Sequence, residues 1–226
     1  MVQCGLMLQN GWGFARDYSQ ARNWFVKAAD AGDSEGMYDI GWMCQNGLGV
    51  PTDYALAMIW CRKSADAGHA SAMNSVGYLH ENGLGVPRGD AQAMIWYLKG
   101  ADAGNADAMT SLGVVYRDGS IVARDYAQAM NWFGKAAEAG SADGMSNLGV
   151  LYMQGWGVAT DYARAMNWFR KAADAGNAGA MNNIGFMYLN GLGVSQDKSQ
   201  ALIWLRKAAA AGNGNAKETL GRLGAK

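Results

Sequence analysis

The 226-residue chain is half apolar and carries 19 basic and 19 acidic side chains, so its formal net charge is zero. A neutral chain lacks the basic excess that binds nucleic acid or anionic membranes, and neither is an expected partner. No apolar run approaches the roughly 20 residues of a membrane-spanning helix, so membrane insertion is not expected. Glycine is abundant, but nine tryptophans and ten tyrosines argue against disorder, which leaves turns and close packing as its role.

A repeat of 36 residues organises the whole sequence. Tryptophan recurs at this interval, with alanine three residues before it, lysine three residues after it, and two further series of glycine. The tryptophan series is Trp24, Trp60, Trp96, Trp132, Trp168 and Trp204. The sequence therefore predicts one repeat domain over residues 1–226, built from about six helix–loop–helix units.

The predicted elements follow in chain order. A truncated first helix is expected over about 2–9. Each unit has a second helix that ends at a recurring glycine, in most units that of a DAG or EAG motif. Five of these helices open with an N-capping aspartate: Asp17, Asp53, Asp125, Asp161 and Asp197. These second helices are predicted near 17–31, 53–67, 89–103, 125–139, 161–175 and 197–211. A capping helix over 215–223 is expected to end the array.

The first helix of each unit begins almost directly after this glycine, so the two helices should pack antiparallel. In the unit that contains "SEGMYDIGWMCQN", Met37, Ile40, Gly41 and Cys44 make one packing face at helical spacing. A glycine within a helix costs about 1 kcal/mol relative to alanine. Its recurrence predicts a close helix crossing, with the tryptophan series as the bulky counterpart. A valine of the following loop, for example Val50, is expected to anchor that loop in the core.

The string "GxGVxxDYxxAxxWxxKAAxxGxxxAMxxLGxxY" resembles the Sel-1-like repeat, a relative of the tetratricopeptide repeat. This resemblance covers essentially the whole chain. It implies an all-α fold: a right-handed superhelical α/α solenoid whose concave side is lined by the first helices. It also implies a bacterial protein–protein interaction scaffold without a cofactor. The compartment stays open between the cytoplasm and the periplasm or exterior.

The histidines and cysteines are the candidates for chemistry. His69 stands where other units have N-capping residues, and His80 replaces a tyrosine, so capping and packing are the interpretations that we favour. Two histidines without suitably spaced carboxylates do not predict a metal site. Cys4, Cys44 and Cys61 replace apolar or aromatic residues, which predicts buried free thiols. Since Cys44 and Cys61 belong to one unit, a disulfide between them stays open.

Some secreted bacterial relatives carry a C-x7-C disulfide in each repeat and are associated with β-lactam binding or hydrolysis. Here the matching positions are Ala29 and Met37, and alanine and methionine again in the next four units. This departure weighs against an enzyme. Because of these secreted relatives, a secreted protein that binds or hydrolyses cell-wall fragments or β-lactams is the alternative to a scaffold.

The first helices also present columns of residues that vary from repeat to repeat, as expected of a surface that recognises a protein or peptide. The predicted groove consists of Tyr38, Trp42, Gln45, Asn74, Tyr78, Glu81, Thr110, Val114, Arg117, Ser146, Val150, Met153, Asn182, Phe186 and Leu189. Only Glu81 and Arg117 are charged, which favours an extended peptide or a helix as the ligand. The Trp42 column could instead belong to the core between units. Trp12 and Trp156 are a second candidate surface, although packing over the helix ends is the favoured role.

Overall fold

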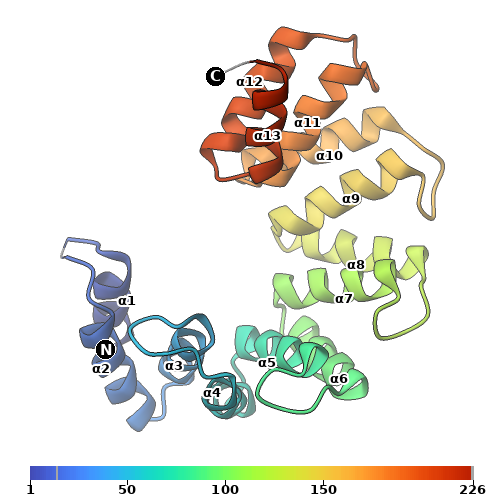
Figure 1. The fold of residues 1–226 in the computed structure, drawn as a ribbon. Coiled ribbons are helices and arrows are strands. Elements are labelled where there is room, and N and C mark those ends of the chain that lie inside the picture. The colour runs from blue at the N-terminus through green and yellow to red at the C-terminus, as the bar shows by residue number, and fades with distance from the viewer. Residues whose placement is uncertain (14, 225–226) are drawn as a thin grey trace. The chain divides into compact units, whose positions relative to one another are not determined.

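The computed structural model describes residues 1–13 and 15–224, which form thirteen α-helices and no strand (Figure 1). The all-α repeat fold predicted from the sequence is confirmed. The chain divides into two compact units, unit 1 (1–112) and unit 2 (113–226). Each helix is 9 or 13 residues long, and none of those described is long and apolar enough to cross a membrane.

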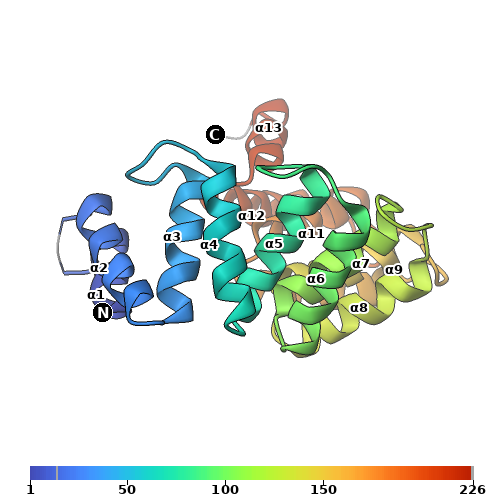
Figure 2. The ribbon, with the colours of Figure 1, turned by 90° about the horizontal axis from the view of Figure 1, so that it is seen from below.

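Unit 1 is a stack in which each helix packs against the next one along the chain, as Figures 1 and 2 show. Its helices are α1 (Val2–Asn10), α2 (Tyr18–Asp30), α3 (Ser34–Asn46), α4 (Tyr54–Asp66), α5 (Ala70–Asn82), α6 (Asp90–Asp102) and the first half of α7 (Ala106–Asp118). The odd-numbered helices are the first helices of the repeats, and the even-numbered ones are the second helices.

Unit 2 continues the same alternation from the second half of α7. Its further helices are α8 (Tyr126–Glu138), α9 (Ala142–Gln154), α10 (Tyr162–Asp174), α11 (Ala178–Asn190), α12 (Lys198–Ala210) and α13 (Gly214–Arg222). The six second helices lie within the ranges expected from the sequence. Helix α13 begins and ends one residue earlier than the expected capping helix. The joining of all repeats into one domain stays a prediction.

The capping chemistry read from the sequence defines the helix ends. The Asp53 carboxylate accepts a hydrogen bond from the Leu56 amide at 2.9 Å, and the other second-helix aspartates do the same for their own first turns. Gly89 takes this position before α6 and offers no side chain to cap with. After the second helices, Gly32 and its equivalents adopt positive φ, at 82° to 93°. This left-handed backbone favours glycine and turns the chain into the next first helix.

One glycine in each of the first helices from α1 to α11 does meet a neighbouring helix, whereas Gly221 of α13 meets nothing within 4 Å. The counterpart is not the tryptophan that the sequence suggested. A Cβ added to Gly77 would lie 2.6 Å from the Tyr97 ring, and one added to Gly149 would lie 2.6 Å from the Phe169 ring. The counterpart series is the residue after each tryptophan: Phe25, Cys61, Tyr97, Phe133, Phe169 and Leu205. Because neighbouring residues lie about 100° apart around a helix, only one of the two adjacent side chains can enter the crossing.

The tryptophans of the 36-residue series lie beside the core, and all of them except the buried Trp96 are half-buried. In all six repeats, the lysine one turn later places its Nζ 4.1–4.8 Å from the ring centroid. This is cation–π geometry. The loop valines behave as predicted in three repeats, where Val50, Val86 and Val194 pack against core clusters.

Candidate partner-binding surface

The predicted groove residues lie on the first helices, and none of the fifteen is fully buried. Seven of them belong to unit 1 and eight to unit 2. Tyr78 and Phe186 are the most exposed aromatic members, with 43% and 46% of their surface accessible. The Trp42 column is mixed, because Val114 and Val150 pack against core clusters of unit 2 while Tyr78 and Phe186 face outward. The column therefore serves both packing and surface.

In unit 1, five predicted residues from α3 and α5 line a single cavity of about 190 Å³. They are Tyr38, Trp42, Gln45, Asn74 and Tyr78. Ser75 and Ser111 complete the lining and were missed by the sequence analysis. Each serine directly follows a member of the predicted set, so the i, i+4, i+7 spacing that selected this set did not include it. The polar and aromatic groups can offer hydrogen bonds and apolar contact to the same ligand.

Hydrogen bonds between adjacent first helices fix this lining. The Ser111 hydroxyl on α7 donates to the Asn74 Oδ1 atom on α5 at 3.0 Å. Burial raises the pKa of Tyr38, and a side-chain hydrogen bond with Ser75 partly offsets the rise. Neighbouring first helices are thus joined by short polar side chains, which preorganise the surface before any ligand arrives.

His69 contacts Tyr38, one of the residues that line this cavity. It caps α5, since its Nδ1 atom accepts a hydrogen bond from the Ala72 amide at 3.2 Å, which confirms the capping interpretation. Its ring stacks on Tyr38 with centroids 4.8 Å apart. Burial lowers the pKa of His69, which keeps the ring neutral and able to accept the hydrogen bond. His69 is therefore a structural support for Tyr38.

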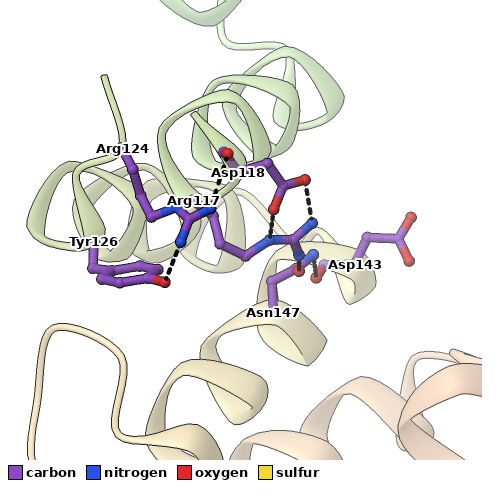
Figure 3. Close-up of polar contacts among 6 residues, drawn as sticks. All are labelled: Arg117, Asp118, Arg124, Tyr126, Asp143 and Asn147. Carbon is purple, nitrogen blue, oxygen red and sulfur yellow. Dashed lines mark hydrogen bonds and ion pairs between the residues drawn. The ribbon is translucent and has the colours of Figure 1, made fainter. Parts of the chain in front are cut away.

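The two charged members of the predicted set are both engaged by neighbours. In unit 1, Glu81 Oε2 accepts a hydrogen bond from the Tyr97 hydroxyl at 2.7 Å. In unit 2, Arg117 lies between Asp118, to which its Nε donates at 2.7 Å, and Asn147, to which its Nη1 donates at 2.5 Å (Figure 3). The pKa of Asp118 is lowered chiefly by this hydrogen bond from Arg117. Both charges therefore stabilise the helix stack.

Asn147 continues this network toward α11. Its side-chain amide donates to the Asp143 carbonyl at 2.9 Å, as drawn in Figure 3. The Asp143 carboxylate accepts from Asn177 Nδ2 at 2.6 Å. The first helices of unit 2 are thus linked by amides and charged groups, whereas those of unit 1 are linked by hydroxyls and amides.

The second candidate surface divides into two cases. Trp156 stacks on Tyr126 with centroids 5.5 Å apart and packs over the start of α8, as favoured from the sequence. Trp12 is 60% exposed, so the packing role favoured for it does not hold.

The cysteines are free thiols in the structure. Cys44 and Cys61 are buried, which agrees with the prediction of core thiols, and no disulfide joins them. Cys4 is exposed, contrary to expectation, because among the described helices α2 is the one that packs closely against α1. Within 1–13 and 15–224, no three His, Cys, Asp or Glu side chains gather closely enough to hold a metal ion.

The repeats match those of a known protein family. The model of the family described as "Sel1 repeat" matches residues 1–33, 34–69, 70–105, 106–141, 142–177 and 178–213. The comparison with curated proteins finds no match.

Solved structures show the same likeness. A Sel1 repeat protein from Oxalobacter formigenes is 32% identical, with a TM-score of 0.85, over 99% of this chain and 89% of that one. The protective antigen c5321 of uropathogenic Escherichia coli, which displays an SLR fold, is 34% identical, with a TM-score of 0.75, over 98% of this chain. This chain spans only 48% of that antigen. The immunity protein Pa5087 from Pseudomonas aeruginosa shares the fold alone, at 17% identity and a TM-score of 0.69, over 94% of this chain and 83% of that one.

Proposed function

The chain belongs to the Sel1 repeat family, and we propose that it is a non-enzymatic scaffold that binds a peptide or an extended partner segment along its first helices. Proteins of this family generally serve as scaffolds for protein interactions. The observation that carries the proposal is the 190 Å³ cavity of unit 1, in which five predicted residues of α3 and α5 come together. It offers the aromatic anchors and the few oriented polar groups that peptide recognition requires.

The chemistry of this surface indicates what the partner presents. Glu81 and Arg117 are held by neighbours, so the surface offers mainly uncharged groups. The exposed Tyr78 ring and the half-buried Trp42 ring favour an apolar or aromatic side chain of the partner. The Asn74 and Gln45 amides can bond to its backbone. Such aromatic anchors commonly carry most of the binding energy of an interface.

A peptide selection provides the test. Peptides enriched from a random displayed library on the intact protein are measured against wild type and the double variant Trp42→Ala/Tyr78→Ala. We expect the double variant to bind them at least about tenfold more weakly, because it removes two aromatic anchors. The matched control is Ile59→Ala/Ile95→Ala, which removes two exposed apolar side chains from the second helices and should leave affinity unchanged. Failure to enrich any peptide, or equal loss in both double variants, would contradict the proposal.

The absence of catalysis is part of the proposal and has its own test. The features that support it are the capping role of His69 and the core position of Cys44 and Cys61. Thermal-shift titration with benzylpenicillin and with muropeptides should give no change in melting temperature and no hydrolysis. Saturable stabilisation or turnover with either compound would favour the cell-wall alternative instead.

A further inference from the structure

A second cavity of unit 1, of about 510 Å³, lies beside the loop that joins α3 to α4. Its walls come from α2, α3, the loop over 47–53 and the first turn of α4, and include Arg22, Cys44, Val50, Asp53 and Leu56. It shares no lining residue with the cavity of the proposed partner surface. Its volume falls within the roughly 300–1,000 Å³ range of small-molecule sites.

Two departures from the repeat pattern accompany this cavity. The position of Cys44 carries an imidazole or phenol ring in the next four repeats, namely His80, Tyr116, Tyr152 and Tyr188. The position of Arg22 is apolar in every later repeat, namely Met58, Met94, Met130, Met166 and Leu202. This repeat has therefore lost a ring that would occupy space next to α2 and has gained a cation at the same place.

The cation lacks a partner. The Arg22 Nε atom is buried and has no hydrogen-bond acceptor, and Arg22 forms no ion pair with any residue that the structure describes. A buried donor without an acceptor costs free energy. The nearby Cys44 thiol does not supply a negative charge, because burial raises its pKa. An anionic group entering the cavity would satisfy Arg22.

An opposite charge lies on another wall of the same cavity. Asp53 caps α4 through its Oδ1 atom, which accepts from the Leu56 amide at 2.9 Å. Asp53 and Arg22 do not pair with each other, although both line the cavity. Between them the lining is largely apolar, including Val50 and Leu56. A ligand that bridges the two charges must carry an anion at one end, a cation close to it, and an apolar body.

We propose that this cavity binds a free α-amino acid with an apolar side chain. Its carboxylate would accept hydrogen bonds from the Arg22 guanidinium, whose planar donors match a carboxylate. Its ammonium group would lie toward the Asp53 carboxylate, and its side chain would pack against Val50 and Leu56 in the space left by the missing ring. This site is independent of the proposed partner surface.

The first test uses the wild-type protein and three related compounds. Binding of L-phenylalanine, 3-phenylpropanoate and phenethylamine is measured by isothermal titration calorimetry. Phenylalanine should bind, and each analogue should bind at least about tenfold more weakly, because each leaves one charged wall group unpaired. No binding of phenylalanine, or equal binding of all three compounds, would overturn the proposal.

Two variants that copy other repeats then locate the site. Cys44→Tyr restores the ring and should abolish phenylalanine binding by filling the cavity. Arg22→Met should weaken phenylalanine at least about tenfold while leaving the weak phenethylamine binding unchanged. Arg62→Met, which changes an exposed arginine of the same unit outside the cavity, is the matched control and should bind like wild type. Unchanged phenylalanine affinity in folded Cys44→Tyr would overturn the assignment, whatever the result at the partner surface.

Discussion

The second helices make the same contacts in every 36-residue repeat, whereas the first helices carry different side chains at equivalent surface positions. In the second helices, each tryptophan bears a lysine above its ring, and the residue after it enters the crossing at a glycine. In the first helices, the position of Trp42 is a tyrosine, two valines and a phenylalanine in later repeats. The second helix of each repeat therefore keeps its packing contacts constant, and the first helix is free to vary its surface.

The largest expected contrast separates two phenylalanines of unit 2. Phe169 is fully buried on α10, and Phe186 is 46% exposed on α11. Phe169→Ala should lower the free energy of unfolding by about 3–5 kcal/mol, because it leaves a cavity in the core. Phe186→Ala should change it by no more than about 0.5 kcal/mol. Urea unfolding of both variants measures the contrast, and equal losses would show that the two faces are not distinct.

A pH effect should follow from Asp39, which is buried on the otherwise variable first helix α3. Burial, with Glu35 and Asp33 nearby, raises the pKa of Asp39 from 3.8 to about 7. Between these two values the folded state keeps a proton that the unfolded state releases, so stability falls as pH rises across this window and stays reduced above it.

Asp39→Asn, which copies the residue at this position in two later repeats, should remove this dependence. We expect the variant to be on the order of 2–4 kcal/mol more stable than wild type at pH 8 and similar to it at pH 4. Thermal melts between pH 4 and pH 8 provide the measurement. Parallel curves for the two proteins would show that the Asp39 carboxyl is not desolvated as the structure implies.

The helix crossing offers a matched pair of glycine substitutions. Gly149→Ala places a Cβ 2.6 Å from the Phe169 ring and should destabilise by about 1–3 kcal/mol through overpacking. Gly134→Ala lies on α8, where an added Cβ meets nothing within 4 Å, and should stabilise by up to about 1 kcal/mol. Chemical denaturation should therefore give opposite signs. Stabilisation of both variants would show that the crossing does not require glycine at position 149.

The smallest expected effect concerns the lysine–tryptophan contact. Lys135 Nζ lies 4.1 Å from the Trp132 ring centroid. Lys135→Met keeps much of the apolar stem and removes the charge, so it should cost about 0.5–1 kcal/mol. The double variant Lys135→Met/Trp132→Leu completes a thermodynamic cycle, and a coupling energy of zero would remove this contact from the account of the second helices.

Much of the fold could be predicted from the sequence because every repeat carries its own start and stop signals. Asp53 before a helix and Gly32 after one have local consequences that need no knowledge of the neighbours. The partner for the glycine series could not be chosen the same way. Two large adjacent residues, such as Trp168 and Phe169, are both suitable by size, and only the direction of the helix crossing decides between them.

The candidate site was predictable to the same degree. Helical spacing placed Tyr38, Asn74 and Tyr78 on one surface, and the structure brings them into one cavity. Helical spacing could not indicate that Ser111 on α7 bonds to Asn74 on α5, because that contact depends on the distance between the two helices. The Arg22 cavity was also missed, since Cys44 was interpreted as an ordinary core thiol in the place of an aromatic residue.

Mapping a bound peptide onto the helices tests whether the first helices carry the partner surface. Amide chemical shifts of the isotopically labelled protein are compared with and without a peptide selected on the wild type. We expect the perturbations to concentrate on α3 and α5, around Tyr38, Trp42, Asn74 and Tyr78. The outer residues of α4 and α6 around Ile59 and Ile95 should stay unchanged. Perturbations concentrated on α4 and α6 would contradict this expectation.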